Sequence, residues 1–72
     1  MSHTATFEES TAKAGYWEMR TPYDTAFLDE FKRAVPPQMR EWDGDEKVWR
    51  VHESELDKAS AIASNYWHVE VE

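Results

Sequence analysis

The chain has 72 residues, no cysteine and only two glycines, and its 15 acidic residues outnumber eight lysines and arginines to leave a formal charge of −7. This length allows one small domain, and the absence of cysteine excludes disulfides, thiolate metal sites and cysteine nucleophiles. No apolar run is long enough to span a bilayer, and the first 15 residues lack the features of a signal peptide. We therefore expect a cytoplasmic protein, with little general attraction to phosphate backbones unless its bases gather locally.

The beginning of the chain is predicted to divide into a tail and a strand. Residues 1–13 are small and polar, with Phe7 as their one large apolar side chain, which predicts a flexible tail. Residues 16–20, YWEMR, alternate so that Trp17 and Met19 share one side. This period of two predicts a strand with one buried face. The single compact domain is therefore expected at residues 14–72.

A helix is predicted after this strand. Asp24 stands where its carboxylate can accept the free N–H groups of a first helical turn. One apolar stripe at helical spacing consists of Phe27, Leu28, Phe31 and Val35. Pro36 and Pro37 then end the helix. The stripe is expected to pack against the sheet.

The stretch MREWDGDEKVWRV, residues 39–51, predicts a β-hairpin with turn chemistry at Gly44. If Trp42 stands opposite Trp49, then Glu41 stands opposite Arg50 and forms a pair of opposite charge. This register places Trp42, Trp49 and Val51 on the core face of the hairpin. A slip by one residue would turn one tryptophan to the wrong side, so the register is well specified.

A second helix and a last strand complete the pattern. Ser54, three residues before Asp57, resembles the start of a capping box. The helical stripe that follows consists of Leu56, Ala59, Ile62, Ala63 and Tyr66. In WHVEVE, Trp67, Val69 and Val71 alternate with polar residues, which predicts a C-terminal strand.

The order β-α-β-β-α-β predicts an α+β fold, in which two helices cover one face of a small, mostly antiparallel sheet. The aromatic share of 14% is expected to supply much of the core in so short a chain. The predicted core consists of Trp17, Met19, Phe27, Leu28, Phe31, Trp42, Trp49, Val51, Leu56, Ile62, Trp67 and Val69.

Motifs for catalysis and metal binding are missing from the sequence. The HES at 52–54 does not continue as H-E-x-x-H because position 56 is Leu56. Asp43 and Asp45 supply too few oxygens for a cation-binding loop, and no glycine-rich phosphate loop exists. RNA-recognition domains share the element order, but Tyr16 is the one aromatic residue predicted on the outer sheet face. We expect a binding module without enzymatic activity, metal or cofactor.

Residues 22–51, PYDTAFLDEFKRAVPPQMREWDGDEKVWRV, resemble segments of HARP domains, the HepA-related modules of SNF2-type annealing helicases. Similar segments occur in small proteins of bacteriophages, actinobacteria and haloarchaea. The matching positions are Tyr23, Asp24, Phe31, Lys32, Pro36, Arg40, Trp42, Asp43, Lys47, Trp49 and Val51. The resemblance implies a compact βαββα-type module that helps a helicase engage forked or single-stranded DNA.

Two functions remain open from the sequence. The first is a nucleic-acid-associated module that acts with a helicase or another replication partner, through the candidate contacts Arg20, Lys32, Arg40, Lys47 and Arg50. The second is an acidic protein-interaction module, of phage or viral type, that docks on a basic partner surface. The C-terminal strand could add to a partner or to a second copy, so we expect a monomer or a weak homodimer through that strand.

Overall fold

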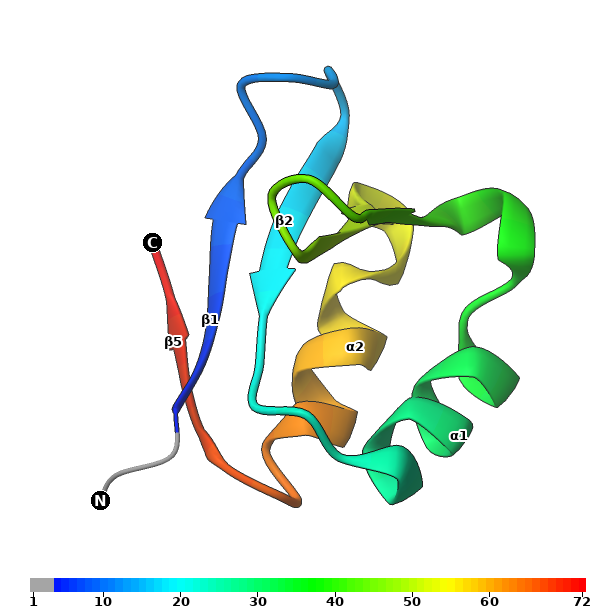
Figure 1. The fold of residues 1–72 in the computed structure, drawn as a ribbon, viewed down its shortest axis with the longest axis vertical. Coiled ribbons are helices and arrows are strands. Elements are labelled where there is room, and N and C mark those ends of the chain that lie inside the picture. Colours follow the sequence, from blue (N-terminus) through cyan, green and yellow to red (C-terminus); the bar gives the residue numbers. More distant parts are fainter. Residues whose placement is uncertain (1–3) are drawn as a thin grey trace.

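The computed structural model describes residues 4–72, which form an α+β domain with the element order β-β-α-β-β-α-β (Figure 1). The strands are β1 (Thr4–Glu9), β2 (Tyr16–Arg20), β3 (Arg40–Asp43), β4 (Val48–His52) and β5 (His68–Val71). The helices are α1 (Thr25–Ala34) and α2 (Leu56–Ala63), and short 3-10 turns at Pro37–Met39 and Glu53–Glu55 precede β3 and α2. The predicted fold class is confirmed, with one strand more than expected.

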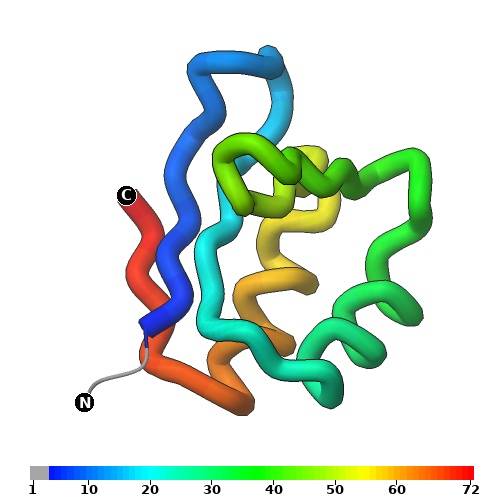
Figure 2. Tube along the Cα trace, in the orientation of Figure 1, coloured from blue at the N-terminus to red at the C-terminus, as the bar shows by residue number. Residues whose placement is uncertain are grey.

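The five strands form one mixed sheet in the order β3-β4-β2-β1-β5. Three neighbouring pairs are antiparallel, and only β1 and β5 run parallel. Both helices lie on one side of this sheet, and the chain trace shows β1 running between β2 and the C-terminal strand (Figures 1 and 2). The edges of the sheet are therefore β3 and β5.

The additional strand corrects the predicted tail over residues 1–13. Residues 4–9 form β1, in which Ala5 and Phe7 are fully buried. Both edges of β1 are paired, and the N–H of Glu72 donates to the carbonyl of Phe7 at 2.8 Å. The alternation of buried and open residues in β1 is weak in the sequence, because Ala5 is small and marks the inner face of the strand poorly. Residues 1–3 of the predicted tail lie outside the described residues.

The core largely follows the predicted apolar pattern. Met19, Phe27, Phe31 and Val51 are fully buried, and they are joined by Ala5, Phe7, Val35, Ala59 and Ala63. Partly buried side chains packed against this cluster include the predicted Trp17, Leu28, Trp49, Leu56, Ile62, Trp67 and Val69. The core assignment of Trp42 is wrong, because its side chain is 51% exposed. Trp42 lies on an edge strand, where it has a neighbouring strand on one side only.

The two helix starts differ in how well the sequence predicted them. Asp24 caps α1 as expected, with its carboxylate accepting the N–H of Phe27 at 2.9 Å. The predicted cap at Ser54 is wrong, because α2 begins later, after Glu55, which makes no side-chain capping bond. The 3-10 turn at Glu53–Glu55 displaces the helix start, and the N–H of Ser54 donates instead to Nδ1 of His52 at 3.1 Å.

Candidate binding groove

The hairpin of β3 and β4 has the predicted register, which places aromatic residues on one face and charged residues on the other. Trp42 stands opposite Trp49, and Glu41 stands opposite Arg50. The tryptophans lie on the side that carries the helices, where the ring of Trp49 meets that of Phe31 at 5.2 Å. Because successive strand residues point to opposite faces, Glu41 and Arg50 lie on the open face of the sheet.

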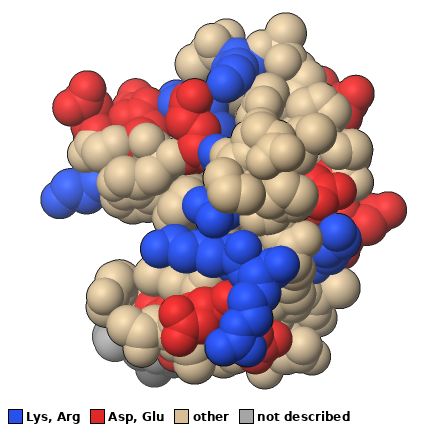
Figure 3. All heavy atoms as spheres, turned by 90° about the vertical axis from the view of Figure 1, so that its right-hand side faces the viewer, with Lys and Arg blue, Asp and Glu red and all other residues tan. Residues whose placement is uncertain are grey.

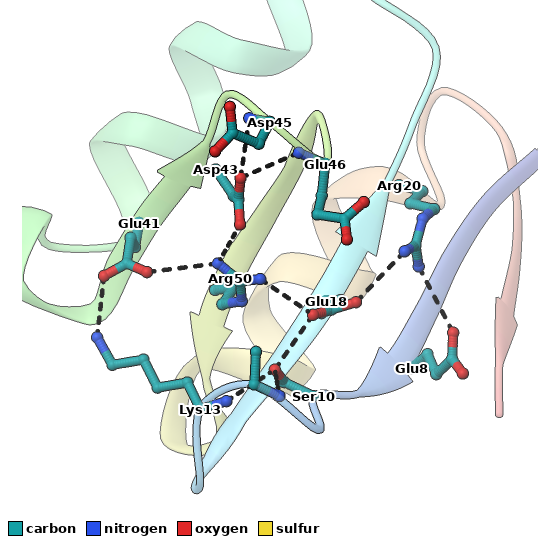
Figure 4. A network of polar contacts seen from close by, with 11 residues as sticks. Glu8, Ser10, Lys13, Glu18, Arg20, Glu41, Asp43, Asp45, Glu46 and Arg50 are labelled. Atoms are coloured by element: carbon teal, nitrogen blue, oxygen red, sulfur yellow. Dashed lines mark hydrogen bonds and ion pairs between the residues drawn. The ribbon is translucent and has the colours of Figure 1, made fainter.

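Arg50 is the centre of an ion-pair network on this open face (Figure 4). Its guanidinium contacts carboxylate oxygens of Asp43 at 2.7 Å, Glu18 at 3.4 Å and Glu41 at 3.6 Å. The residue is only 7% exposed. A buried guanidinium already surrounded by three carboxylates is not available for phosphate, so we remove Arg50 from the candidate contacts.

Arg20 belongs to the same open face. Its guanidinium contacts Glu8 at 3.5 Å and Glu18 at 3.3 Å, and Figure 4 shows it at the far side of the Arg50 network. The structure thus separates the five predicted contact residues into two groups. Arg20 and Arg50 are neutralised by acids on the open face of the sheet, away from the other three bases.

Asp43 connects this network to the hairpin turn. Its Oδ1 accepts the N–H groups of Asp45 at 2.9 Å and Glu46 at 3.0 Å. The bond from Glu46 and the guanidinium of Arg50 hold the pKa of the Asp43 carboxyl below its usual value, and Asp43 in turn raises the pKa of Arg50. Favourable partners for the charged carboxylate stabilise the fold while that carboxylate stays ionised.

We expect the Asp43→Asn variant to be less stable than the wild type at pH 7, by a difference that shrinks as the pH falls. The pKa of Asp43 is lowered on folding from the model-compound value of 3.8. Its contribution is therefore fully present above about pH 4 and is lost as the pH falls through the folded pKa. The asparagine keeps the oxygen that accepts the two turn N–H groups, but an NH2 group replaces the Oδ2 that faces Arg50. The variant therefore loses the negative charge together with its hydrogen bond to the guanidinium, while the turn contacts are kept.

Urea unfolding midpoints of both proteins between pH 7 and pH 3 measure this difference. Asp45→Asn is the matched control, because Asp45 is exposed and forms no ion pair within residues 4–72. Its midpoint should follow that of the wild type throughout. A difference for Asp43→Asn that stays constant down to pH 3 would contradict the assigned role of the carboxylate.

A groove of about 540 Å³ opens on the opposite side of the hairpin from the Arg50 network. It lies between the segment that joins β2 to α1, one side of α1, and the two strands and turn of the hairpin. The lining residues are Met19, Thr21, Pro22, Tyr23, Leu28, Lys32, Trp42, Lys47 and Trp49. Figure 3 shows the hollowed right-hand face of the molecule, with Lys and Arg side chains gathered across its middle. The groove is mainly apolar and aromatic, with two lysines.

Trp49 lines this groove, and the positively charged side chains of Lys32 and Arg40 lie over its ring. Lys32 Nζ lies 5.8 Å from the centre of its ring, and Arg40 Cζ lies 6.0 Å from it. The negative face of an aromatic ring attracts cations at such distances. Arg40 is further fixed by the bond from its Nε to the carbonyl of Val35 at 3.0 Å. Trp49 therefore keeps positive charge beside the groove.

Two lysines line the groove, and they belong to a set of bases on α1 and the hairpin that form no ion pair. Within residues 4–72, Lys13, Arg20, Arg50 and Lys58 form ion pairs with acidic side chains, whereas Lys32, Arg33, Arg40 and Lys47 form none. All four of the latter lie on α1 or on the hairpin. In a chain with 15 acids and eight bases, the Lys and Arg side chains without an ion pair in residues 4–72 are thus concentrated on two neighbouring elements.

The backbone of Lys47 has an unusual conformation. Its φ is +57°, and it is the one non-glycine residue with positive φ among residues 4–72. The turn chemistry predicted at Gly44 is thus completed at Lys47, where glycine or asparagine would fit more easily. The side chain of this lysine lines the groove, so the one such backbone conformation in the described part of the chain lies at the groove.

The sequence identified only part of this groove. It selected Lys32, Arg40 and Lys47, which the structure brings to one region, but it assigned Trp42 to the core and gave Tyr23 no role beyond its place in the HARP-like motif. Both side chains are open to solvent, with Tyr23 84% and Trp42 51% exposed. Trp42 is exposed because β3 is an edge strand, and which strand of the hairpin lies at the edge follows only from the strand order.

No family model, curated protein or solved structure matches this chain. The HARP-like resemblance therefore stays a prediction. No group of three or more His, Asp and Glu side chains in residues 4–72 is arranged to hold a metal ion. Of the helices in this part of the chain, none combines the length and apolarity needed to cross a membrane.

Proposed function

We propose that the protein is a small non-enzymatic binding module whose groove binds single-stranded nucleic acid. The observation that supports this function is an aromatic groove lined by Lys32 and Lys47, two bases that form no ion pair within residues 4–72, with Arg40 beside its Trp49. A cationic groove with exposed aromatic side chains is the usual arrangement for binding single strands. The volume of about 540 Å³ lies within the range of ordinary ligand sites.

The distribution of charge favours a local contact over extended binding to a duplex. The chain carries a formal charge of −7, so most of its surface repels a phosphate backbone. Among residues 4–72, the Lys and Arg side chains that form no ion pair all lie on α1 or the hairpin. A flexible single strand can bring a few phosphates to this region while the rest of the strand stays away from the acidic surface.

The proposed partner of the module is a helicase or another replication protein that acts on forked or single-stranded DNA. This part of the proposal is supported by the HARP-like pattern of residues 22–51, which includes Lys32, Arg40 and Lys47. A weakly binding module of this kind contributes most when it is held near DNA by a partner, because local concentration then adds to its affinity.

We expect the double variant Lys32→Gln/Lys47→Gly to bind a labelled single-stranded 12-mer on the order of 50-fold more weakly than the wild type at 50 mM salt. Loss of two phosphate contacts should also reduce the slope of log K against log salt concentration by about 1.4. Glycine at position 47 suits the positive φ, so the folded state should be retained. Fluorescence anisotropy over a salt series measures both quantities.

The matched control is Lys13→Gln/Lys58→Gln, which changes the net charge equally. Lys13 pairs with Glu41 and Lys58 with Glu55, and neither lines the groove. This control should bind almost as the wild type does. Equal losses in the two double variants, or the same affinity for a poly-glutamate peptide as for DNA, would reject a nucleic-acid groove.

The alternative function is an acidic module that docks on a basic protein surface. It is supported by the overall charge of −7 and by exposed carboxylates on β1 and β5, such as Glu8 and Glu70. β5 is an edge strand that could pair with a partner strand or with a second copy. Salt-sensitive binding to poly-lysine, unchanged by the groove variants and accompanied by no binding to DNA, is the result expected of this alternative.

A further inference from the structure

We infer that the groove recognises an unpaired nucleobase, which stacks on the indole of Trp42 while the neighbouring phosphates approach Lys32 and Lys47. This inference rests on the proposed function and makes it more specific. In this mode the groove binds bases as well as the phosphate backbone. The two tryptophans that face each other across the hairpin then have different roles.

Trp49 is not free to stack on a ligand. Its ring meets that of Phe31 at 5.2 Å and that of Trp42 at 5.4 Å, and two cations lie within 6.0 Å of its centre. It is also packed against the main core cluster. The environment of Trp49 is therefore filled by protein groups, and its role is to support the groove and to hold the bases beside it.

Trp42 has the opposite environment. Its side chain is 51% exposed although it is large and apolar, and its strand β3 forms the edge of the sheet. The backbone of Gly44 lies so close that an added Cβ would be 3.6 Å from Trp42 Nε1, which places the hairpin turn against one edge of the indole. The ring contacts Trp49 at a tilt of 55°. Trp42 is thus supported by its neighbours while much of its surface faces the groove and the solvent.

The other groups in the groove complement a nucleotide rather than a purely apolar ligand. Lys32 and Lys47 line it and lack acidic partners, so they match phosphate in charge. Tyr23, 84% exposed, supplies a second open aromatic ring in the same lining. Every base has a π-face that can stack on such rings, whatever the sequence.

The inferred mode requires a base that has left its stack. Bases within a duplex are covered on both faces by their neighbours, so they offer no free face to Trp42. Single strands, frayed ends and unpaired loops offer such faces at low cost. The groove is therefore expected to prefer these forms to a fully paired duplex of the same length.

The test compares two single-stranded 12-mers with the same number of phosphates, one carrying all its bases and one fully abasic. The wild type should bind the first about 5-fold to 150-fold more tightly, which corresponds to the stacking of one base. The Trp42→Leu variant should lose most of this preference and bind the base-containing strand nearly as weakly as the wild type binds the abasic strand. The Trp42→Phe variant keeps an aromatic ring and should retain part of the preference.

A second readout needs no variant. The base-containing strand should quench the tryptophan fluorescence of the wild type more strongly than the abasic strand does at equal saturation.

Thermal unfolding of Trp42→Leu should match the wild type, because the side chain lies at an exposed edge. Equal binding of both strands by the wild type overturns this inference and leaves the proposed function intact. Binding of neither strand overturns both.

Discussion

Phe7→Ala is expected to lower the free energy of unfolding by about 3–5 kcal/mol, as for other fully buried aromatic residues. Phe7 is 0% exposed and lies in β1, which pairs with β2 on one edge and with β5 on the other. Small domains of this size have a total stability of only about 5–10 kcal/mol. The variant should therefore lose a large part of its stability and unfold at a much lower urea concentration than the wild type.

Urea unfolding followed by far-UV circular dichroism measures this loss. Glu9→Ala is the control, because Glu9 is exposed on the same strand. It should unfold close to the wild type, within about 0.5 kcal/mol. If Phe7→Ala unfolds like the wild type as well, the first strand does not contribute to the core, and residues 4–13 behave as the tail that their polar composition predicts.

Trp49→Ala is expected to cost about 3 kcal/mol of stability and to abolish binding in the groove. The estimate lies at the lower end for aromatic truncation because the side chain is only partly buried. The variant loses the ring contacts with Phe31 and Trp42 and the support for Lys32 and Arg40. Unfolding midpoints and strand binding, both measured at a temperature where the variant is folded, show the two effects.

The comparison with Trp42 makes this prediction specific. The two rings are 5.4 Å apart on adjacent strands, yet Trp42→Leu should lose base recognition with little change in stability. Trp49→Phe should recover much of the stability, because it restores an aromatic contact with Phe31. Equal stability losses at positions 42 and 49 would contradict the division of roles between these residues.

The local features of the fold follow from short stretches of sequence. The cap at Asp24, the apolar stripe of α1 and its end near the two prolines depend on residues within a few positions of one another. The pairing of Trp42 with Trp49 likewise follows from one turn and one alternating pattern on each side of it. In such cases the sequence determines the structure because side-chain period, capping and turn chemistry agree.

The two wrong predictions, a tail in place of β1 and a core position for Trp42, have a common physical cause in long-range pairing. The burial of β1 depends on strands that come later in the chain, above all β5. The pattern of Ala5 and Phe7 is too weak to predict a buried strand by itself. Trp42 was placed in the core because alternation distinguishes the two faces of a strand but does not say which strand is at the edge.

The candidate site also combines features that follow from local sequence with features that follow from the arrangement of distant strands. The sequence by itself determined the α+β class, the hairpin register and the bases Lys32, Arg40 and Lys47 as candidates. The enclosure of Arg50 by carboxylates and the opening of Trp42 into a groove become visible in the folded chain alone. These properties depend on the strand order β3-β4-β2-β1-β5, which arises from pairing between distant segments and leaves no periodic trace in any one of them.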